Sequence, residues 1–359
     1  MLNEDAIKSY LRTKFKDVSQ IGIHKLGAGV QGAGFLIEIG TKDGIKSYVV
    51  KGLFPEGLGH DYPSDRAAVF LLDLDEYKNL PGHVHAVDVL AELPDGSIKS
   101  VGGGIEYYLL MERAEGRDYF HDLREFSHKQ RLEEEDIGKI KFMAAYLADI
   151  HSVKKVSRHL YWRKIRDIIG HGECLMGVFD TYPEGVLDYA AMAEIEKLCI
   201  DWRAKLKSRT HRLCRIHGDF HPGNIWFKDD GGIATAGNAT QSGVNFVLLD
   251  RSRGPWGDPA DDVTALTINY IFFSLIYSNE VKGVYLEGLE LFFNEYIRLT
   301  GDNELFEVLA PFYAFRGVVV ANPVFYPDIK PETRDRIFRL IRKILMQDRF
   351  EIDILKSGF

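Results

Sequence analysis

The chain has 359 residues, of which 45% are hydrophobic, 27% charged and 12% aromatic, and its formal net charge is −8 at pH 7. This length predicts two domains or one two-lobed unit, and the composition is that of a globular protein. The acidic balance argues against general nucleic-acid binding, which needs a basic face. Three scattered cysteines without a CxxC pair argue against a disulfide framework or a thiolate metal site, and they favour a reducing cytoplasm.

No segment predicts a targeting signal or a membrane span. Residues 1–15 lack an apolar core followed by a cleavage site, so they do not have the pattern of a signal peptide. The most apolar window, residues 265–277, is too short and too polar to cross a bilayer, and we expect a buried helix there. We therefore expect a cytoplasmic protein with neither a membrane nor a nucleic-acid partner; the sequence does not set its oligomeric state.

The N-terminal part of the chain is rich in strand signals. Residues 35–39 alternate between apolar and polar, residues 45–51 form a second strand-like run, and residues 105–112 form a third. Between them, residues 62–80 have the pattern of a helix, with Ser64 as its expected N-cap. These segments predict a β-rich first lobe.

From about residue 128 the pattern becomes mostly helical, with short strands expected at 224–227 and 245–250. The segment 228–245 between those strands is rich in Gly, Ala, Thr and Asn without periodicity, so we expect a surface loop there. A helical second lobe therefore follows the first.

The boundary between the lobes is expected within residues 112–118, where polar residues and Gly116 follow the third apolar run. We assign residues 1–114 to a first lobe that includes the hinge, and residues 115–359 to a helical second lobe.

A glycine-rich stretch precedes the strand at 35–39 and contains Gly27, Gly29 and Gly32 in a Gly-x-Gly-x-x-Gly pattern. A dinucleotide-binding fingerprint needs a helix after the last glycine, whereas here the sequence alternates with period two. No Gly-Lys-Ser/Thr follows, so the stretch is not a P-loop. Two explanations stay open: a hairpin whose bare backbone lies over a triphosphate, or an ordinary turn or β-bulge.

Lys51 ends the second strand on the same face as Val49, a position that is otherwise apolar. A charge there needs a partner. Phosphate oxygens together with a carboxylate from the following helix, Asp65 or Glu76, would supply it. The two acids lie about 16 Å apart along a helix, so only one of them reaches Lys51, and the sequence does not choose between them.

Residues 215–227, RIHGDFHPGNIWF, hold the densest set of chemically capable side chains. Pro222 and Gly223 exclude a helix, so Asp219 and Asn224 share one tight loop before a strand. Asp250 ends the next apolar strand. Carboxylate and amide oxygens in this arrangement predict a magnesium site that also uses phosphate oxygens.

Two other interpretations of the same stretch compete with the magnesium site. A transition metal held by His217, Asp219 and His221 would need more ligands nearby, and the sequence shows no second histidine cluster. A purely structural turn would explain the proline and glycine, but not the glycine-rich stretch and Lys51 that precede it in order.

The ordered set of segments resembles the aminoglycoside phosphotransferase and choline kinase family, small-molecule relatives of protein kinases. The matching segments, spread over residues 27–262, are GAGVQG, VVK, LLMERAEG, LADIH, HGDFHPGNIWF and LLDRSRGPWGDPADD. The resemblance implies an α+β, protein-kinase-like two-lobed fold, with an N-terminal antiparallel sheet and one main helix before a mostly helical C-terminal lobe.

The resemblance also implies site residues for an ATP- and Mg²⁺-dependent phosphotransferase that acts on a small-molecule hydroxyl. Asp219 is the implied catalytic aspartate, which orients the hydroxyl and accepts its proton, and His217 braces its loop. The implied magnesium ligands are Asn224 and Asp250. The implied ATP-binding residues are Gly27, Gly29, Gly32, Lys51, the Glu112 carbonyl and the Ala114 N–H.

Departures from protein kinases favour a small acceptor over a protein. Asp250 is followed by Arg251 and Ser252 instead of Phe-Gly, and His221 stands where protein kinases carry a lysine. No activation segment is recognisable. Two alternatives to a small-molecule kinase stay open. The second hypothesis is a nucleotide-binding module without transfer activity, and the third is a protein kinase.

The acceptor is expected between the Asp219 loop and the C-terminal helices. The aromatic stretch 310–327 either lines a pocket there, with Arg316 as an anion contact, or packs into the core.

Overall fold

The computed structural model describes residues 3–28, 32–55, 59–77, 84–104, 107, 109, 111–228, 246–251 and 253–356. The chain divides into two compact units, Met1–Met111 and Glu112–Phe359. Each unit is described by itself. The surface loop expected at 228–245 lies outside the described residues apart from Lys228.

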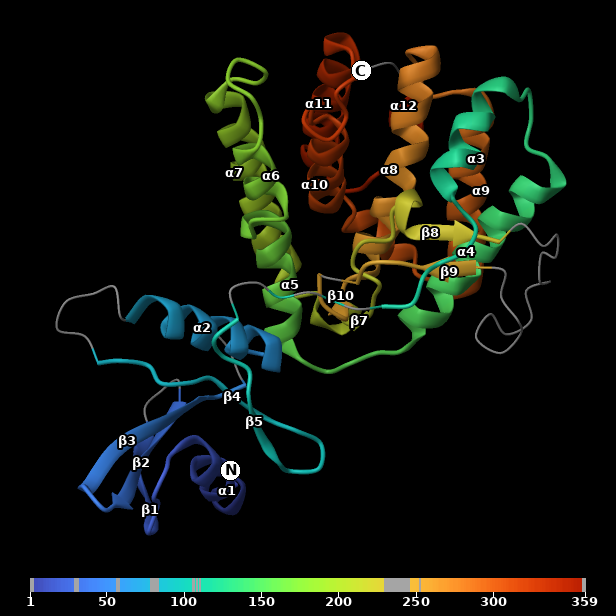
Figure 1. The fold of residues 1–359 in the computed structure, drawn as a ribbon. Helices are drawn as coiled ribbons and strands as arrows, with labels where there is room; N and C mark the ends of the chain where they lie inside the picture. The colour runs from blue at the N-terminus through green and yellow to red at the C-terminus, as the bar shows by residue number, and fades with distance from the viewer. Residues whose placement is uncertain are drawn as a thin grey trace. The chain divides into compact units, whose positions relative to one another are not determined.

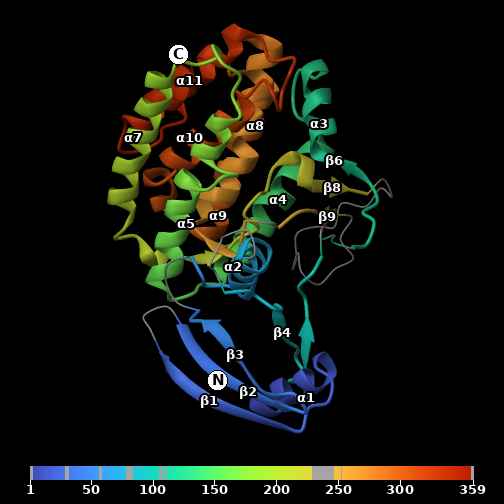
Figure 2. The same ribbon diagram turned by 60° about the vertical axis from the view of Figure 1, so that its left-hand side comes forward.

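The first unit is built on a three-stranded antiparallel sheet in the order β1-β2-β3, followed by the two-stranded β4-β5 pair (Figure 2). Its elements are α1 (Glu4–Lys14), β1 (Gln20–Ala28), β2 (Gly32–Thr41), β3 (Gly44–Leu53), α2 (Pro63–Glu76), β4 (Leu90–Glu92) and β5 (Ile98–Ser100).

One face of the three-stranded sheet packs against α1. The buried centre of this contact consists of Ile7 and Leu11 from α1 and Ile37 and Ile39 from β2. Because alternate residues of a strand point to opposite faces, this arrangement leaves the set that includes Val49 on the other side of the sheet. Val49 is exposed.

Two expectations for this unit differ from the structure. The helix α2 takes Tyr62 as its N-cap, with Pro63 in the first turn, instead of Ser64. Proline is favoured there because its missing N–H has no helical partner in the first turn. The strand expected at 105–112 is absent at the residues of it that the structure describes, 107, 109, 111 and 112. Leu109 is 86% exposed, so an apolar run here does not mark a buried strand.

The second unit is mostly helical, with a small antiparallel sheet in the order β6-β8-β9 and a β7-β10 pair (Figure 1). Its strands are β6 (Arg117–Asp118), β7 (Cys214–Arg215), β8 (Ile225–Phe227), β9 (Phe246–Leu248) and β10 (Trp256–Gly257). Its α-helices are α3 (Tyr119–Glu125), α4 (Glu134–Ser152), α5 (Arg158–Gly170), α6 (Leu175–Asp180), α7 (Tyr189–Leu206), α8 (Pro259–Ser278), α9 (Gly283–Thr300), α10 (Ala310–Val320), α11 (Pro331–Leu345) and α12 (Asp353–Lys356).

Helix α8 is the centre of this unit. It is buried from Pro259 to Leu275 and contacts α9, α10 and α4. This confirms the buried helix expected at 265–277 except at its last two residues, Ile276 and Tyr277, which are exposed. A helix that is apolar on all sides has to be enclosed by others. Its start is fixed by Asp258, whose side chain accepts from the Ala260 N–H at 3.0 Å.

The two units together confirm the predicted α+β fold class: an antiparallel N-terminal sheet with a helix, then a mostly helical unit. No described helix has the length and apolar character of a membrane span. All three cysteines, Cys174, Cys199 and Cys214, are buried and unpaired. Burial raises the pKa of each thiol, that of Cys174 to about 11.

A buried carboxylate joins three segments of the first unit. Asp88 accepts hydrogen bonds from the Tyr10 hydroxyl, from Lys14 Nζ at 2.7 Å and from Ser100 Oγ at 2.7 Å. Burial alone would raise the pKa of Asp88, but these hydrogen bonds and the Lys14 charge lower it to about 2. Because the folded pKa lies below the ordinary value, the stabilisation is present above about pH 4 and is lost as the pH falls toward 2.

We expect Asp88→Asn to destabilise the packing of α1 by roughly 1 to 2 kcal/mol at pH 7 and to have little effect near pH 2. Amide hydrogen exchange of residues 4–14 in the full chain measures this as a loss of protection. Asp43→Asn, an exposed acid in the β2–β3 turn, is the control and should leave protection unchanged. Equal protection of Asp88→Asn and the wild type at pH 7 would contradict the expectation.

Candidate active site

The loop that carries Asp219 runs from β7 to β8 inside the second unit, and it is buried instead of lying on the surface. His217, Asp219 and Asn224 are 5%, 6% and 8% exposed. Gly218 has a φ of +92°, a conformation that glycine adopts without strain. Residues Pro222–Asn224 form a short 3₁₀ turn that leads directly into β8.

A carboxylate from the first turn of α8 fixes the backbone of this loop. Asp262 accepts the N–H groups of His217 and Gly218, each at 2.7 Å, and lies 3.2 Å from His151 Nε2. His151 in turn contacts the Tyr296 hydroxyl at 2.8 Å. Burial acts to raise the pKa of Asp262, but His151 and His217, the latter also through its backbone N–H, lower it, so the group stays ionised.

The Asp219 carboxylate is paired with two arginines. Arg316 Nη1 of α10 lies 2.5 Å from Asp219 Oδ1, and Arg253 Nη1 lies 3.4 Å from the same oxygen. Burial favours a raised pKa, but the charges of Arg316, Arg253 and His221 together with the Arg316 hydrogen bond lower the pKa of Asp219 to about 2. Asp219 is therefore a carboxylate at neutral pH, able to accept a proton from a donor placed against it.

Backbone pairing brings Asn224 and Asp250 to the same place. Asn224 Nδ2 donates to the Asp219 carbonyl at 3.0 Å, which leaves the amide oxygen for a cation. Ile225 pairs with Leu248, and the Leu249 N–H donates to the Asn224 carbonyl at 3.0 Å. Asp250 is the next residue, so it follows β9 beside the end of the loop, exposed and with a φ of +47°.

Each of the two loop histidines accepts a hydrogen bond from a backbone N–H of the loop. His217 Nδ1 accepts from the Asp219 N–H at 3.2 Å, and His221 Nδ1 accepts from the Gly223 N–H at 3.0 Å. In the part of the chain that the structure describes, no three His, Cys, Asp or Glu side chains converge as metal ligands. Both imidazoles are therefore used by the backbone of the loop, and Asn224 and Asp250 as magnesium ligands stay a prediction.

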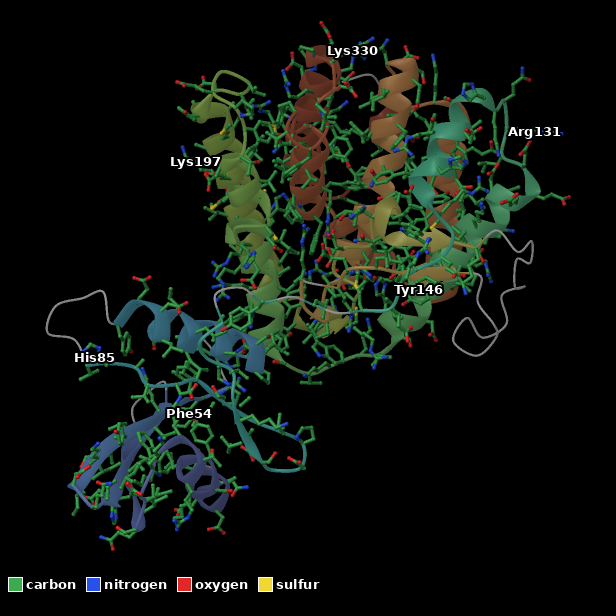
Figure 3. The ribbon with its side chains drawn as sticks, viewed as in Figure 1. Phe54, His85, Arg131, Tyr146, Lys197 and Lys330 are labelled. Atoms are coloured by element: carbon green, nitrogen blue, oxygen red, sulfur yellow. The ribbon has the colours of Figure 1, made fainter. Side chains whose placement is uncertain are left out.

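Aromatic side chains enclose the loop. Tyr146 of α4, labelled in Figure 3, stacks on Phe220 with ring centroids 5.9 Å apart. Phe120 of α3 lies 5.9 Å from the His221 ring, and Phe315 of α10 lies beneath the Arg253 guanidinium. The aromatic residues of α10, Phe312, Tyr313 and Phe315, are buried. Over 310–320 the structure therefore agrees with core packing, one of the two interpretations that the sequence left open.

The first unit contains the glycines and Lys51. Lys51 pairs with Gly34 across β2 and β3, on the sheet face that also carries Leu26 and Val49. A side chain at Gly32 would lie 2.2 Å from the Gly52 carbonyl oxygen, so this strand position requires glycine. Gly27 pairs with Gly34 on β1, and Gly29 lies outside the described residues.

Lys51 is exposed, and among the described residues no ion pair joins it to Asp65 or Glu76. Asp65 instead accepts the Tyr62 N–H at 2.7 Å. The pairing of Lys51 with either Asp65 or Glu76 therefore stays a prediction.

Glu112 and Ala114 lie in an irregular segment before β6, Glu112 exposed and Ala114 half-buried. Gly116 follows with a φ of +121°, and a side chain there would lie 2.3 Å from the Phe227 carbonyl oxygen. Glycine is therefore required where this segment meets β8.

Several residues around Asp219 were not recognised from the sequence. Asp261 and Asp262 lie in the first turn of α8, where an acid is common, so their sequence position does not distinguish them. Lys164 and Arg253 gave no signal, because Arg253 reaches Asp219, and Lys164 reaches Asp261, from distant segments. Arg316 was expected as an anion contact, and the anion it contacts is the Asp219 carboxylate itself.

Comparison with known proteins identifies a family over part of the chain. Residues 73–236 match the family model described as the phosphotransferase enzyme family. No curated protein matches the chain.

The solved structures that this chain resembles include kinases of small molecules. A glucosamine kinase is 13% identical, with a TM-score of 0.42, over 94% of this chain and 97% of the other. Choline kinase from Cryptosporidium parvum Iowa II is 12% identical, with a TM-score of 0.37, over 95% of each chain. Amicoumacin kinase in complex with AMP-PNP and Ca²⁺ is 13% identical, with a TM-score of 0.39, over 98% and 99%.

We expect Asp262→Ala to lower the free energy of unfolding of the second unit by about 3 to 5 kcal/mol, because it leaves two buried N–H groups and His151 without their acceptor. All four tryptophans lie in this unit, so urea unfolding followed by tryptophan fluorescence measures the loss. Asp149→Ala, an exposed acid on α4, should change stability by less than about 0.5 kcal/mol. A loss no larger than that of the control would show that Asp262 does not hold the loop.

Proposed function

We propose that this chain, whose residues 73–236 match the phosphotransferase enzyme family, transfers the γ-phosphate of Mg²⁺-bound ATP to a hydroxyl group of a small molecule. The observation that carries the proposal is the convergence of Asp219, Asn224 and Asp250 at one end of β8 and β9. An ionised carboxylate beside two oxygen ligands is the arrangement that phosphoryl transfer needs.

Asp219 is the catalytic residue in this proposal. Phosphoryl transfer passes through a loose transition state, so the protein contributes mainly position and charge. Asp219 holds the acceptor hydroxyl and takes its proton as the bond to phosphorus forms. Its arginine partners keep it ionised without solvent, so it is ready for this role at neutral pH.

The oxygen atoms of Asn224 and Asp250 fit a magnesium ion, a hard cation that prefers carboxylate and amide oxygens. When bound, the ion neutralises charge on the phosphates. His217 supports these residues from the backbone, because it accepts the Asp219 N–H.

Nucleotide binding is assigned to residues of the first unit and to Glu112 and Ala114 at the start of the second. Lys51 contributes a charge to the α- and β-phosphates, and Leu26 and Val49 on the same face offer apolar surface to the base. Gly27, Gly29 and Gly32 let the backbone approach the phosphates. The Glu112 carbonyl and the Ala114 N–H are assigned to the adenine edge.

The acceptor is a small alcohol or amino alcohol in this proposal, and the protein works in a reducing compartment such as the cytoplasm, because its cysteines are unpaired. The similar structures carry names that suggest a first panel of acceptors: choline, ethanolamine, glucosamine and amicoumacin.

We expect Asp219→Asn to lower transfer by about 10²- to 10⁴-fold, because the amide cannot accept the proton. ATP consumption measured across the acceptor panel gives the rate, and calorimetry with Mg·ATP should give a dissociation constant within a few-fold of the wild type. The control is Asp201→Asn, an exposed acid on α7.

Three outcomes speak against the proposal. Turnover of Asp219→Asn at the wild-type rate rejects its role. A wild-type protein that binds Mg·ATP but phosphorylates no acceptor favours a nucleotide-binding module. Phosphorylation of itself or of a generic protein favours a protein kinase.

We expect Lys51→Met to weaken Mg·ATP binding by about 10- to 100-fold, because a charged hydrogen bond to phosphate contributes about 1.5 to 3 kcal/mol. Calorimetry measures this directly. Lys46→Met is a matched control, since Lys46 is exposed on the same strand but faces the other side of β3. Equal affinities of Lys51→Met and Lys46→Met would remove Lys51 from the site.

A further inference from the structure

The Asp219 carboxylate belongs to a closed ring of charges within the second unit. We call this the charge ring; its members are Asp219, Arg316, Asp261, Lys164 and Arg253. Arg316 Nη2 lies 2.8 Å from Asp261 Oδ1, and Asp261 Oδ2 lies 2.6 Å from Lys164 Nζ. Lys164 Nζ donates to the Arg253 carbonyl at 3.2 Å, and the Arg253 guanidinium returns to Asp219.

The charge ring treats the two oxygens of Asp219 differently. Arg316 and Arg253 both approach Oδ1, at 2.5 and 3.4 Å. Among the described residues, no hydrogen bond reaches Oδ2. Arg316 also donates to the carbonyl of Gly218 at 3.0 Å, so one guanidinium holds the carboxylate and the peptide that precedes it.

We propose that Arg316 is a positioning residue, which holds Oδ1 and the Gly218 carbonyl so that Oδ2 of Asp219 is presented to the acceptor hydroxyl. The inference rests on the proposed function. In the reaction the hydroxyl oxygen forms a bond to the γ-phosphorus, the bond from that phosphorus to the β,γ-bridging oxygen breaks, and ADP leaves. The hydroxyl proton goes to Oδ2.

Arginine suits this position because its planar fork serves three acceptors at once: Asp219 Oδ1, the Gly218 carbonyl and Asp261 Oδ1. Lysine is a single point donor on a flexible stem and can satisfy only part of this set. Arg316 is 4% exposed, so neither its charge nor its direction is set by water. Lys164 keeps Asp261 in place from the other side.

The first variants are Arg316→Lys and Arg316→Met. We expect kcat to fall by about 100-fold in Arg316→Met, as a misplaced catalytic group costs about this much, and by less in Arg316→Lys. The Kd for Mg·ATP should not change. The probes are Mg·ATP with choline, ethanolamine or glucosamine, and Mg·ATP alone, with water as the acceptor.

A double-mutant cycle separates positioning from simple structural damage. If Arg316 acts through Asp219, then Arg316→Lys with Asp219→Asn should be no slower than Asp219→Asn alone. The matched control is Arg212→Lys, another buried arginine, which pairs with Asp258 and Asp302 outside the charge ring. Its folded fraction should retain the wild-type kcat.

A second variant guards against misfolding. Thermal unfolding reports whether Arg316→Lys is folded; if it is not, Asp261→Asn removes the charge that anchors Arg316 and should give a smaller fall in kcat. A wild-type kcat in the folded variants, or additive losses in the cycle, overturns the inference while the proposed function stands. Absence of any transfer or hydrolysis by the wild type overturns both.

Discussion

The burial of one carboxylate, that of Asp262, is the constraint on which the second unit depends. Its two oxygens receive the N–H groups of His217 and Gly218 and face His151, so its charge is satisfied only while the loop keeps this backbone path. Removal of its partners would leave a buried charge, at a cost of several kcal/mol. The loop with Asp219 is therefore bound to the helical core through α8 and α4.

Around this fixed backbone, the charge of Asp219 is set by the protein and not by solvent. Arg316 belongs to α10, which is otherwise apolar, and Arg253 follows β9. Two separate segments must therefore fold before Asp219 has its partners. The short strands β8 and β9 then bring the backbones of Asn224 and Asp250 close together through three residue pairs. Chemistry at this place is thus a property of the tertiary structure, with each polar group held by at least one distant segment.

The sequence was sufficient for features that local chemistry determines. Pro222 and Gly223 define the turn that places Asp219 near Asn224, and the uniformly apolar stretch that became α8 requires burial from its composition alone. Arg316 lies 97 residues from Asp219, and no local pattern joins them. From the sequence, Asp262 is an ordinary acid in the first turn of a helix, and only the structure shows that it accepts the N–H groups of His217 and Gly218. The apolar run that ends at Met111 predicted a strand that the described residues do not form. A sequence does not distinguish a leucine that will be exposed from one that will be buried.

The three buried thiols have a practical consequence. Cys174, Cys199 and Cys214 are buried, and their pKa values are raised. In the folded protein at neutral pH, maleimide reagents therefore cannot reach these sulfur atoms, which are also not in the reactive thiolate form. A new surface cysteine would therefore be labelled selectively without first replacing the native ones. Such a label would report on its own surroundings without background from Cys174, Cys199 or Cys214.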